Sequence, residues 1–286
     1  MAGLRTLSLR TAALAALAMC AFAANSLLCR AALGASAVDP FTFTAVRLAS
    51  GALMLAGLAR AGSRRTTPPG AWVSATALFV YAIAFSLAYL SIPAAVGALT
   101  LFGAVQATMI GWGLLAGDRP RPREWLGLTL STAGLVGLAL PGLSAPDPLG
   151  VALMAAAGAA WGVYSLRGRG AGDPLGVNAA NFARGVPMAL AAAAAGAASR
   201  GLYVSSRGAL LAAASGALAS GLGYAVWYAA LRGLTPTQAA VVQLSVPPLA
   251  ALGGVVLLGE AVGMRLVACG AAILGGITLA LLSHRR

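Results

Sequence analysis

The sequence has few charged residues and no lysine at all. Charged side chains make up 9% of the 286 residues and hydrophobic side chains 60%, whereas soluble globular chains carry about 25% charged residues. This shortage excludes a water-soluble domain, because too little polar surface remains to cover one. In a bilayer, only helices and closed barrels satisfy every backbone hydrogen bond, and a barrel would show short segments of alternating polarity. The apolar runs here are long and unbroken, so the sequence predicts an all-α integral membrane protein.

Groups that carry enzyme chemistry are equally scarce. The one histidine is His284, close to the C-terminus, and the three cysteines have no metal-ligand spacing. The six acids all fall at predicted span ends or in loops: Asp39, Asp118, Glu124, Asp147, Asp173 and Glu260. Covalent or metal-assisted catalysis needs a nucleophile with its base, or a ligand set, inside the membrane. We therefore expect no enzyme, no catalytic residue, no metal and no cofactor. A purely structural or receptor-like bundle stays open as an alternative to a carrier.

The absence of an acid at mid-membrane depth bears on energy coupling. A proton relay in a transporter normally uses a buried carboxylate. The sequence thus argues against carboxylate-based proton antiport, and leaves uniport, substrate-driven flow or another coupling open.

The cationic residues are all arginines, and their placement indicates topology. The net charge of +13 would be compatible with nucleic-acid binding, but the arginines stand singly or in short clusters between apolar runs. Cytoplasmic loops of membrane proteins are enriched in basic residues. With the N-terminus inside, thirteen of the nineteen arginines fall in cytoplasmic segments. We expect a multi-pass protein of the inner (plasma) membrane with both termini cytoplasmic, a lipid bilayer as its surroundings, and no nucleic-acid partner.

Ten spans of about the length that a bilayer requires can be delimited by loop and turn residues. They are predicted at 11–33, 41–60, 71–91, 93–115, 124–142, 149–167, 175–198, 208–231, 235–258 and 263–282. The first segment could alternatively be a cleavable signal peptide, but its apolar stretch continues to about Leu33. Its removal would also spoil the repeat described next.

Matching features recur in the same order in the two halves of the chain. They are Asn25-Ser26-Leu27 with Tyr164-Ser165-Leu166, Asp39-Pro40 with Asp173-Pro174, and Gly117-Asp118 with Gly259-Glu260. Phe43 and Arg47 follow the first Asp-Pro pair, and Phe182 and Arg184 follow the second. Each half holds five spans, an odd number, so the halves must cross the membrane in opposite directions. Two inverted five-helix repeats, 11–142 and 149–283, are typical of secondary transporters, whose substrate site lies between the halves.

These residues resemble the drug/metabolite transporter superfamily, of the ten-helix type with two EamA domains, over nearly the whole chain. The resemblance depends on the matched pairs above, on Trp161-Gly-Val-Tyr164-Ser-Leu-Arg167, on Pro247-Pro248 followed by Leu257-Leu-Gly-Glu260, and on Gly270 to Gly276. It implies export of amino acids or related metabolites without ATP, and within the superfamily it is nearest to the aromatic amino-acid exporters. One departure is that Val105-Gln106 occupies the place in the fourth span that matches Pro247-Pro248.

Aromatic residues are the first candidates for substrate binding. Tyr81, Phe85 and Tyr89 recur at helical spacing on one face of the third span. Further aromatics lie in the sixth and eighth spans: Trp161, Tyr164, Tyr224, Trp227 and Tyr228. They suit a partly apolar, zwitterionic or cationic substrate. Packing between helices, or the interfacial aromatic belt in the case of Tyr89, is the alternative interpretation.

Polar side chains within spans are the second set. Asn25, Gln106 and Gln243 are predicted to bind substrate, with hydrogen bonding between helices as the alternative. Arg47 and Arg184 lie inside spans, where a guanidinium is costly. Their matched positions favour a gating or structural role, with direct binding of a substrate carboxylate as the alternative. Asn178 and Asn181 fall near a predicted span end and receive no role.

Pro187, Pro247 and Pro248 fall inside predicted spans and break backbone hydrogen bonds there. We interpret them as gating hinges, with packing as the alternative. The sequence thus predicts a transporter that exports amino acids or related small metabolites by alternating access, acting as a monomer. Carriers of sugars, nucleotide-sugars or cationic drugs are the alternatives.

Overall fold

The chain folds into a bundle of long helices in the computed structural model, which describes residues 8–61, 71–115, 122–140, 146–168, 173–234 and 242–283. The first six helices are α1 (Leu9–Leu33), α2 (Pro40–Ala61), α3 (Trp72–Ala88), α4 (Ala94–Leu115), α5 (Pro122–Ala139) and α6 (Pro148–Gly168). The rest of the described helices are α7 (Pro174–Arg200), α8 (Ser206–Ala214), η1 (Ser215–Leu222), α9 (Gly223–Leu231), α11 (Val246–Leu258) and α12 (Met264–Ser283). The all-α prediction is confirmed, and the first eight spans and the tenth lie close to their predicted bounds.

Membrane insertion accounts for the surface of this bundle. Large apolar side chains such as Leu53, Leu115 and Met264 are 75%, 87% and 81% exposed, an arrangement that lipid tolerates and water does not. Within the described residues, five helices are long and apolar enough to cross a bilayer: Leu9–Leu33, Pro40–Ala61, Ala94–Gly113, Pro148–Gly168 and Ser206–Leu231. The protein is therefore a multi-pass membrane protein.

The predicted ninth span, 235–258, is not one continuous helix. Residues 242–243 are helical, a turn follows at Leu244–Ser245, and α11 begins only at Val246. Pro247 and Pro248 fall in the first turn of α11, where a proline costs no intrahelical hydrogen bond. The expectation that they break backbone hydrogen bonds inside a helix is wrong, because they help to start a new helix, whereas their role as gating hinges stays a prediction. Pro187, in contrast, lies inside α7 as predicted.

The eighth span changes its helical type halfway. Between α8 and α9, the eight residues of η1 form a π-helix. Such wide turns are rare and often occur at functional sites. This one faces α1 and α2, and Gly216 permits its backbone to approach α2 so closely that a side chain would collide with Ser50 and the Arg47 carbonyl.

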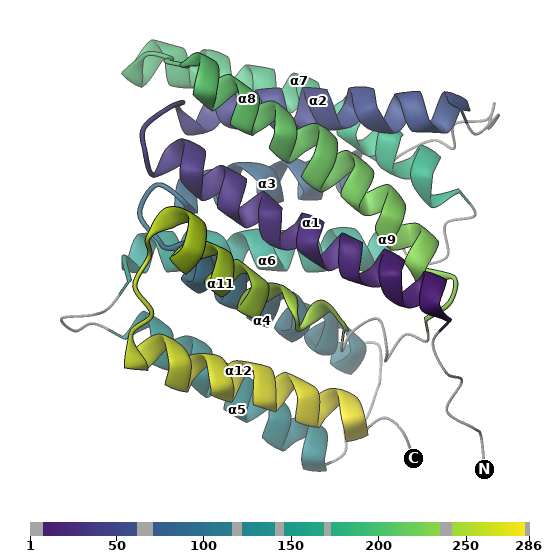
Figure 1. Cartoon of the computed structure of the whole chain (residues 1–286), viewed down its shortest axis with the longest axis vertical. Helices are drawn as coiled ribbons and strands as arrows, with labels where there is room; N and C mark the ends of the chain where they lie inside the picture. The colour runs from purple at the N-terminus through teal and green to yellow at the C-terminus, as the bar shows by residue number, and fades with distance from the viewer. Residues whose placement is uncertain are drawn as a thin grey trace.

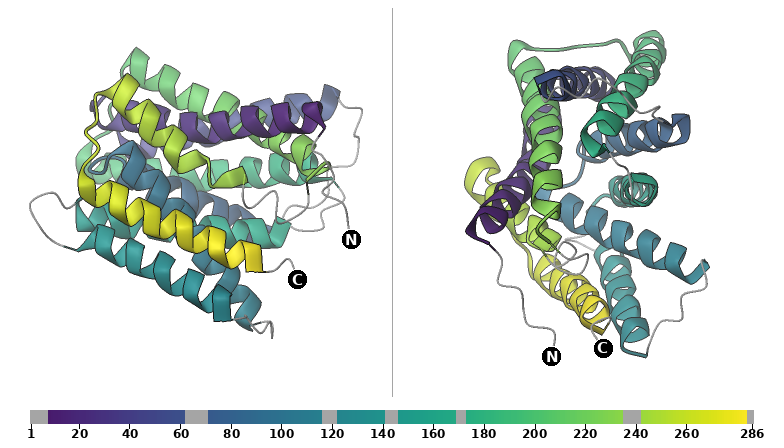
Figure 2. Two further views of the ribbon diagram at one scale, coloured as in Figure 1. Left: turned by 60° about the horizontal axis from the view of Figure 1, so that its bottom comes forward. Right: turned by 90° about the vertical axis from the view of Figure 1, so that its right-hand side faces the viewer.

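The helices pair in a regular pattern. The pair α5 and α12 lies at one end of the bundle, whereas α2, α7 and α8 lie at the other (Figures 1 and 2). Between them α3 and α4 pack on α6, and α9 and α11 pack on α1. Exchanging the two halves of the chain maps these pairings onto one another, a pattern compatible with two related halves. The division at 142 and 149 and its inverted symmetry stay a prediction.

Asp39 shows why one predicted helix begins where it does. Its carboxylate Oδ1 accepts from the backbone N–H groups of Phe41 and Thr42 at 3.0 and 2.9 Å, so it caps α2 as the Asp-Pro pair suggested. Its Oδ2 accepts from Tyr203 N at 3.1 Å, which ties the start of α2 to the segment before α8. Asp173 occupies the same position before α7, but its side chain makes no capping hydrogen bond.

Candidate functional site

A small cavity of about 30 Å³ lies among helices of both halves of the chain. Its lining comes from α1, α3, α4, α6, η1 and α9, and from residue 243 ahead of α11: Phe22, Asn25, Ser26, Tyr81, Phe85, Leu101, Phe102, Trp161, Ala219, Ser220, Tyr224 and Gln243. Ligand pockets for small molecules have volumes of about 300–1,000 Å³ with mostly apolar walls and a few polar groups. This cavity has that composition but is much smaller than that range, so a ligand can enter only when the surrounding helices move apart.

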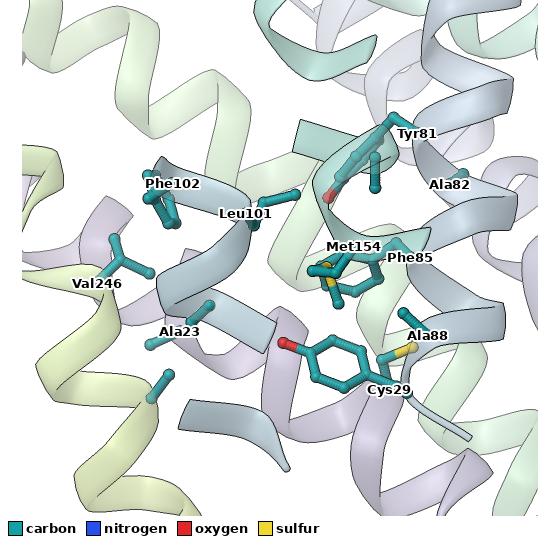
Figure 3. Close-up of a cluster of buried hydrophobic side chains, with 14 of the residues drawn as sticks. Ala23, Cys29, Tyr81, Ala82, Phe85, Ala88, Leu101, Phe102, Met154 and Val246 are labelled. Carbon is teal, nitrogen blue, oxygen red and sulfur yellow. The ribbon is translucent and has the colours of Figure 1, made fainter. Parts of the chain in front are cut away.

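The apolar part of the wall is a continuous set of aromatic rings. The Trp161 ring lies 4.9 Å from Tyr81 and 5.1 Å from Tyr224, centroid to centroid, and Tyr81 lies 5.4 Å from Phe85. These separations fall in the range that aromatic pairs prefer. In Figure 3, Tyr81 and Phe85 project from α3, whereas Leu101 and Phe102 lie on α4 across the cluster.

The polar part of the wall is a chain of hydrogen bonds that crosses four helices. Ser215 Oγ donates to Asn25 Oδ1 at 2.7 Å, and Asn25 Nδ2 donates to the Tyr81 hydroxyl at 3.4 Å. The same hydroxyl accepts from Arg47 Nη2 at 2.7 Å, while Arg47 Nε donates to Ser220 Oγ at 3.4 Å. The π-helix η1 supplies the serine at each end of this chain. A local change of helical type therefore has a direct consequence for the site.

Arg47 stands directly behind this wall. Its side chain is 1% exposed, and its guanidinium lies 5.0 and 4.9 Å from the ring centroids of Tyr81 and Phe85. Within the described part of the chain no carboxylate pairs with it, and its Nη1 has no hydrogen-bond partner. An arginine stays charged in proteins, so the cavity wall has a positive charge that no described acid balances.

Six of the predicted substrate-binding residues line this cavity: Asn25, Tyr81, Phe85, Trp161, Tyr224 and Gln243. The structure places the other five outside the lining. Tyr89 is fully buried beyond Phe85, where its hydroxyl donates to the Ala94 carbonyl at 3.4 Å, so it belongs to no interfacial belt. Gln106 is buried on α4, and Trp227 and Tyr228 pack in the hydrophobic core.

Tyr164 is held away from the cavity by two amides. Its hydroxyl donates to Asn178 Oδ1 and accepts from Asn181 Nδ2, the latter at 3.5 Å. Both asparagines are buried. They lie near the start of α7, as predicted, but the expectation that they have no role does not hold, because both hydrogen-bond to Tyr164 on α6.

Arg184 is not a structural counterpart of Arg47. Its side chain is half-buried, donates to the Ala180 carbonyl at 3.5 Å and lies 5.8 Å from the Trp72 ring at the start of α3. The matched sequence positions predicted equivalent roles, but the guanidinium of Arg184 does not reach the cavity wall.

Six residues of the cavity lining were not predicted from the sequence. Phe22, Ser26, Leu101, Phe102, Ala219 and Ser220 are ordinary residues of apolar helices, and only their tertiary neighbours distinguish them. Ser220 had one available signal, since it belongs to a Ser- and Gly-containing stretch, Ser215 to Gly223, within a span. As for metals, the described residues contain no cluster of three or more potential metal ligands.

Comparisons with known proteins agree with this description. Residues 148–282 match the model of the EamA-like transporter family. The chain is 55% identical over 273 residues to "Uncharacterized protein PA1977" of Pseudomonas aeruginosa, covering 95% of this chain and 94% of the relative. A solved structure described as "Crystal structure of protein" superposes with a TM-score of 0.66 at 24% identity, covering 95% and 97% of the two chains. At that identity the solved structure supports the fold alone.

Proposed function

The chain belongs to the EamA-like transporter family of the drug/metabolite superfamily, and on that premise we propose that it exports amino acids or related small metabolites by alternating access. The observation that carries this proposal is the cavity, which is enclosed by helices of both halves and combines an aromatic wall with a chain of polar groups. Because the cavity is smaller than an amino acid in this structure, the substrate would enter as the two halves move apart, which alternating access requires.

The composition of the wall supports amino acids over the alternatives. A cationic drug would have to lie against the unbalanced charge of Arg47, which raises the cost of its binding. A sugar or nucleotide-sugar carrier would be expected to offer more polar side chains than Asn25, Ser26, Tyr81, Ser220, Tyr224 and Gln243. Aromatic rings with a few hydrogen-bonding groups suit a zwitterion that has an apolar side chain.

Helix geometry supports a moving carrier. Pro187 interrupts the hydrogen-bond ladder of α7. A turn also interrupts the helix ahead of α11, next to the lining residue Gln243. Interrupted helices beside a substrate site are common in secondary transporters. We propose the inner membrane as its location, both termini on the cytoplasmic side, and a monomer as the functional unit.

The test is flux in proteoliposomes. Purified protein should release preloaded radiolabelled amino acids faster than protein-free liposomes, with aromatic and aliphatic amino acids preferred over glucose. Measurement with and without a pH gradient distinguishes uniport from proton coupling. Correctly inserted protein that moves none of a broad amino-acid panel would contradict the proposal, and selective movement of the sugar would support the alternative substrate class.

A further inference from the structure

The hydroxyl of Tyr81 has one hydrogen-bonding function left unused. A hydroxyl oxygen can accept two hydrogen bonds and donate one. Arg47 Nη2 and Asn25 Nδ2 both donate to Tyr81 Oη, which fills its acceptor positions. Among the described residues none accepts its own hydrogen. Because Tyr81 lines the cavity, that hydrogen is available to a bound molecule.

The position of Tyr81 is fixed by the groups around it. Ser215 holds the Asn25 carboxamide oxygen at 2.7 Å, so that the amide nitrogen is directed to Tyr81. The ring itself packs between Phe85 and Trp161. A donor held by fixed neighbours loses little entropy when it binds a ligand.

The positive charge of Arg47 determines which kind of acceptor the Tyr81 hydroxyl prefers. Arg47 is buried, permanently charged and without a described carboxylate partner, and its Nη1 lacks any described acceptor. Burial of an unbalanced guanidinium at membrane depth is costly, and an anion in the cavity would offset that cost. A hydrogen bond from a donor polarised by a cation to a charged acceptor is stronger than one between neutral groups.

We infer that the cavity selects substrates that have a carboxylate, which the Tyr81 hydroxyl binds with Arg47 as the charge behind it. This inference rests on the proposed transport function and specifies its substrate class. The remainder of the substrate packs against Phe85, Trp161 and Tyr224. One guanidinium shielded by one hydroxyl matches a single negative charge, so a carboxylate fits this site better than a doubly charged phosphate.

The experiment compares each amino acid with its amide, which lacks the carboxylate charge. Proteoliposomes are assayed with L-phenylalanine and L-phenylalaninamide, and with L-leucine and L-leucinamide. The wild-type protein should prefer the acids over the amides by about 10-fold or more, as expected for hydrogen bonds to a charged group. Tyr81→Phe should raise KM for the acids by roughly 10- to 100-fold and change KM for the amides little.

Two further variants separate recognition from folding. Arg47→Gln should reduce the preference for acids, while Arg47→Lys should retain part of it because the charge remains. Tyr203→Phe, at a tyrosine that is 47% exposed and is not part of the cavity lining, is the matched control and should behave as wild type. If Arg47→Gln does not fold, as judged by gel filtration, Tyr81→Phe still decides the question.

The outcomes distinguish the two proposals. Equal transport of acids and amides by the wild type, or an equal rise in KM for both in Tyr81→Phe, would overturn the carboxylate inference and leave the transport function standing. Failure to transport any of the four compounds, and any other compound of the amino-acid panel, would overturn the proposed function itself and the inference with it.

Discussion

Glu260 and Arg30 form the ion pair that joins the end of α11 to the end of α1, with Arg30 Nε 3.3 Å from Glu260 Oε1. The same carboxylate accepts from Ala94 N at 3.0 and 2.9 Å through its two oxygens, which satisfies a free N–H at the start of α4. Arg30 Nη1 in turn donates to the carbonyls of Tyr89 and Leu90 at 3.0 and 3.3 Å. Two side chains thus connect α1, the turn from α3 to α4, and α11 on one side of the membrane.

Removal of this carboxylate should destabilise the protein. We expect Glu260→Ala to lower the free energy of unfolding by about 1–3 kcal/mol, because it leaves the Ala94 N–H and the Nε of the half-buried Arg30 without their acceptor. Thermal unfolding in detergent measures the effect. Arg207→Gln, which changes an exposed arginine near the start of α8, is the control. An unfolding midpoint for Glu260→Ala equal to that of Arg207→Gln would show that the network contributes nothing to stability.

Trp161 should be important for transport and Trp112 should not. Trp161→Ala removes the ring that contacts Tyr81 and Tyr224 in the cavity, and the loss of this apolar contact should raise KM for the transported amino acid by roughly 10-fold or more. Trp112 is 59% exposed on α4, so Trp112→Ala is a matched control of the same size. Both variants are compared per mole of folded protein, and equal reductions in flux would favour a packing role for Trp161.

Tyr164 should affect stability without changing substrate affinity. Tyr164→Phe leaves Asn178 without its hydroxyl partner and Asn181 with one hydrogen bond fewer in a buried position, which costs about 1–3 kcal/mol. The unfolding midpoint should fall while KM stays the same, in contrast to the result expected for Tyr81→Phe. A change in KM with unaltered stability would place Tyr164 in the substrate path after all.

Asp147 should make stability depend on pH in the acidic range. The Ser91 hydroxyl donates to its Oδ2 at 2.6 Å and Gly150 N donates at 2.8 Å, and these hydrogen bonds lower the pKa of the carboxyl below its ordinary value. A carboxyl whose pKa is lowered by folding stabilises the folded state above the unfolded pKa of about 3.9, and this contribution is lost as pH falls through the folded pKa.

The measurement is the unfolding midpoint of wild type and Asp147→Asn between pH 7 and pH 3. The asparagine retains an acceptor at the start of α6 but does not titrate. The wild type should be more stable at neutral pH, and the difference should diminish below about pH 4. A difference that stays constant over the whole range would exclude this contribution from Asp147.

The predicted orientation can be tested with single cysteines in a cysteine-free background. Tyr203→Cys, on the segment between α7 and α8, should react with a membrane-impermeant maleimide added to intact cells, because that segment is predicted to lie outside. Arg60→Cys, exposed at the end of α2, should react only after the membrane is opened. The reverse labelling pattern would show that the protein has the opposite orientation.

Local patterns in the sequence predicted much of the fold and part of the site. Asp39-Pro40 correctly placed the start of α2, since a cap and a proline act on their own helix. The helical spacing of Tyr81 and Phe85 correctly placed both rings on one face. The same reasoning could not separate Tyr89 from them, since all three share that face. Tyr89 is outside the cavity lining, and its hydroxyl donates to the Ala94 carbonyl at the start of α4.

Sequence correspondence was a weaker guide than helical geometry. Arg47 and Arg184 follow matched Asp-Pro pairs, yet only Arg47 reaches the cavity wall. Arg47 donates to Tyr81 and to Ser220 of η1, whereas Arg184 donates to the carbonyl of Ala180 on its own helix. Pro247 and Pro248 indicated that the helix of the ninth span is interrupted. Whether they kink a helix or begin one depends on the turn at Leu244–Ser245.

By itself, the sequence determined that this protein is a bundle of membrane helices. Twenty-residue apolar runs with charges between them leave the backbone no other way to satisfy its hydrogen bonds in lipid. Only the tertiary structure decided which polar residues form the site. Ser215, Asn25, Tyr81 and Arg47 lie on different helices, and their hydrogen bonds exist only when those helices pack together. A side chain's role in a membrane depends on the partners it finds there, and these partners are distant in the sequence.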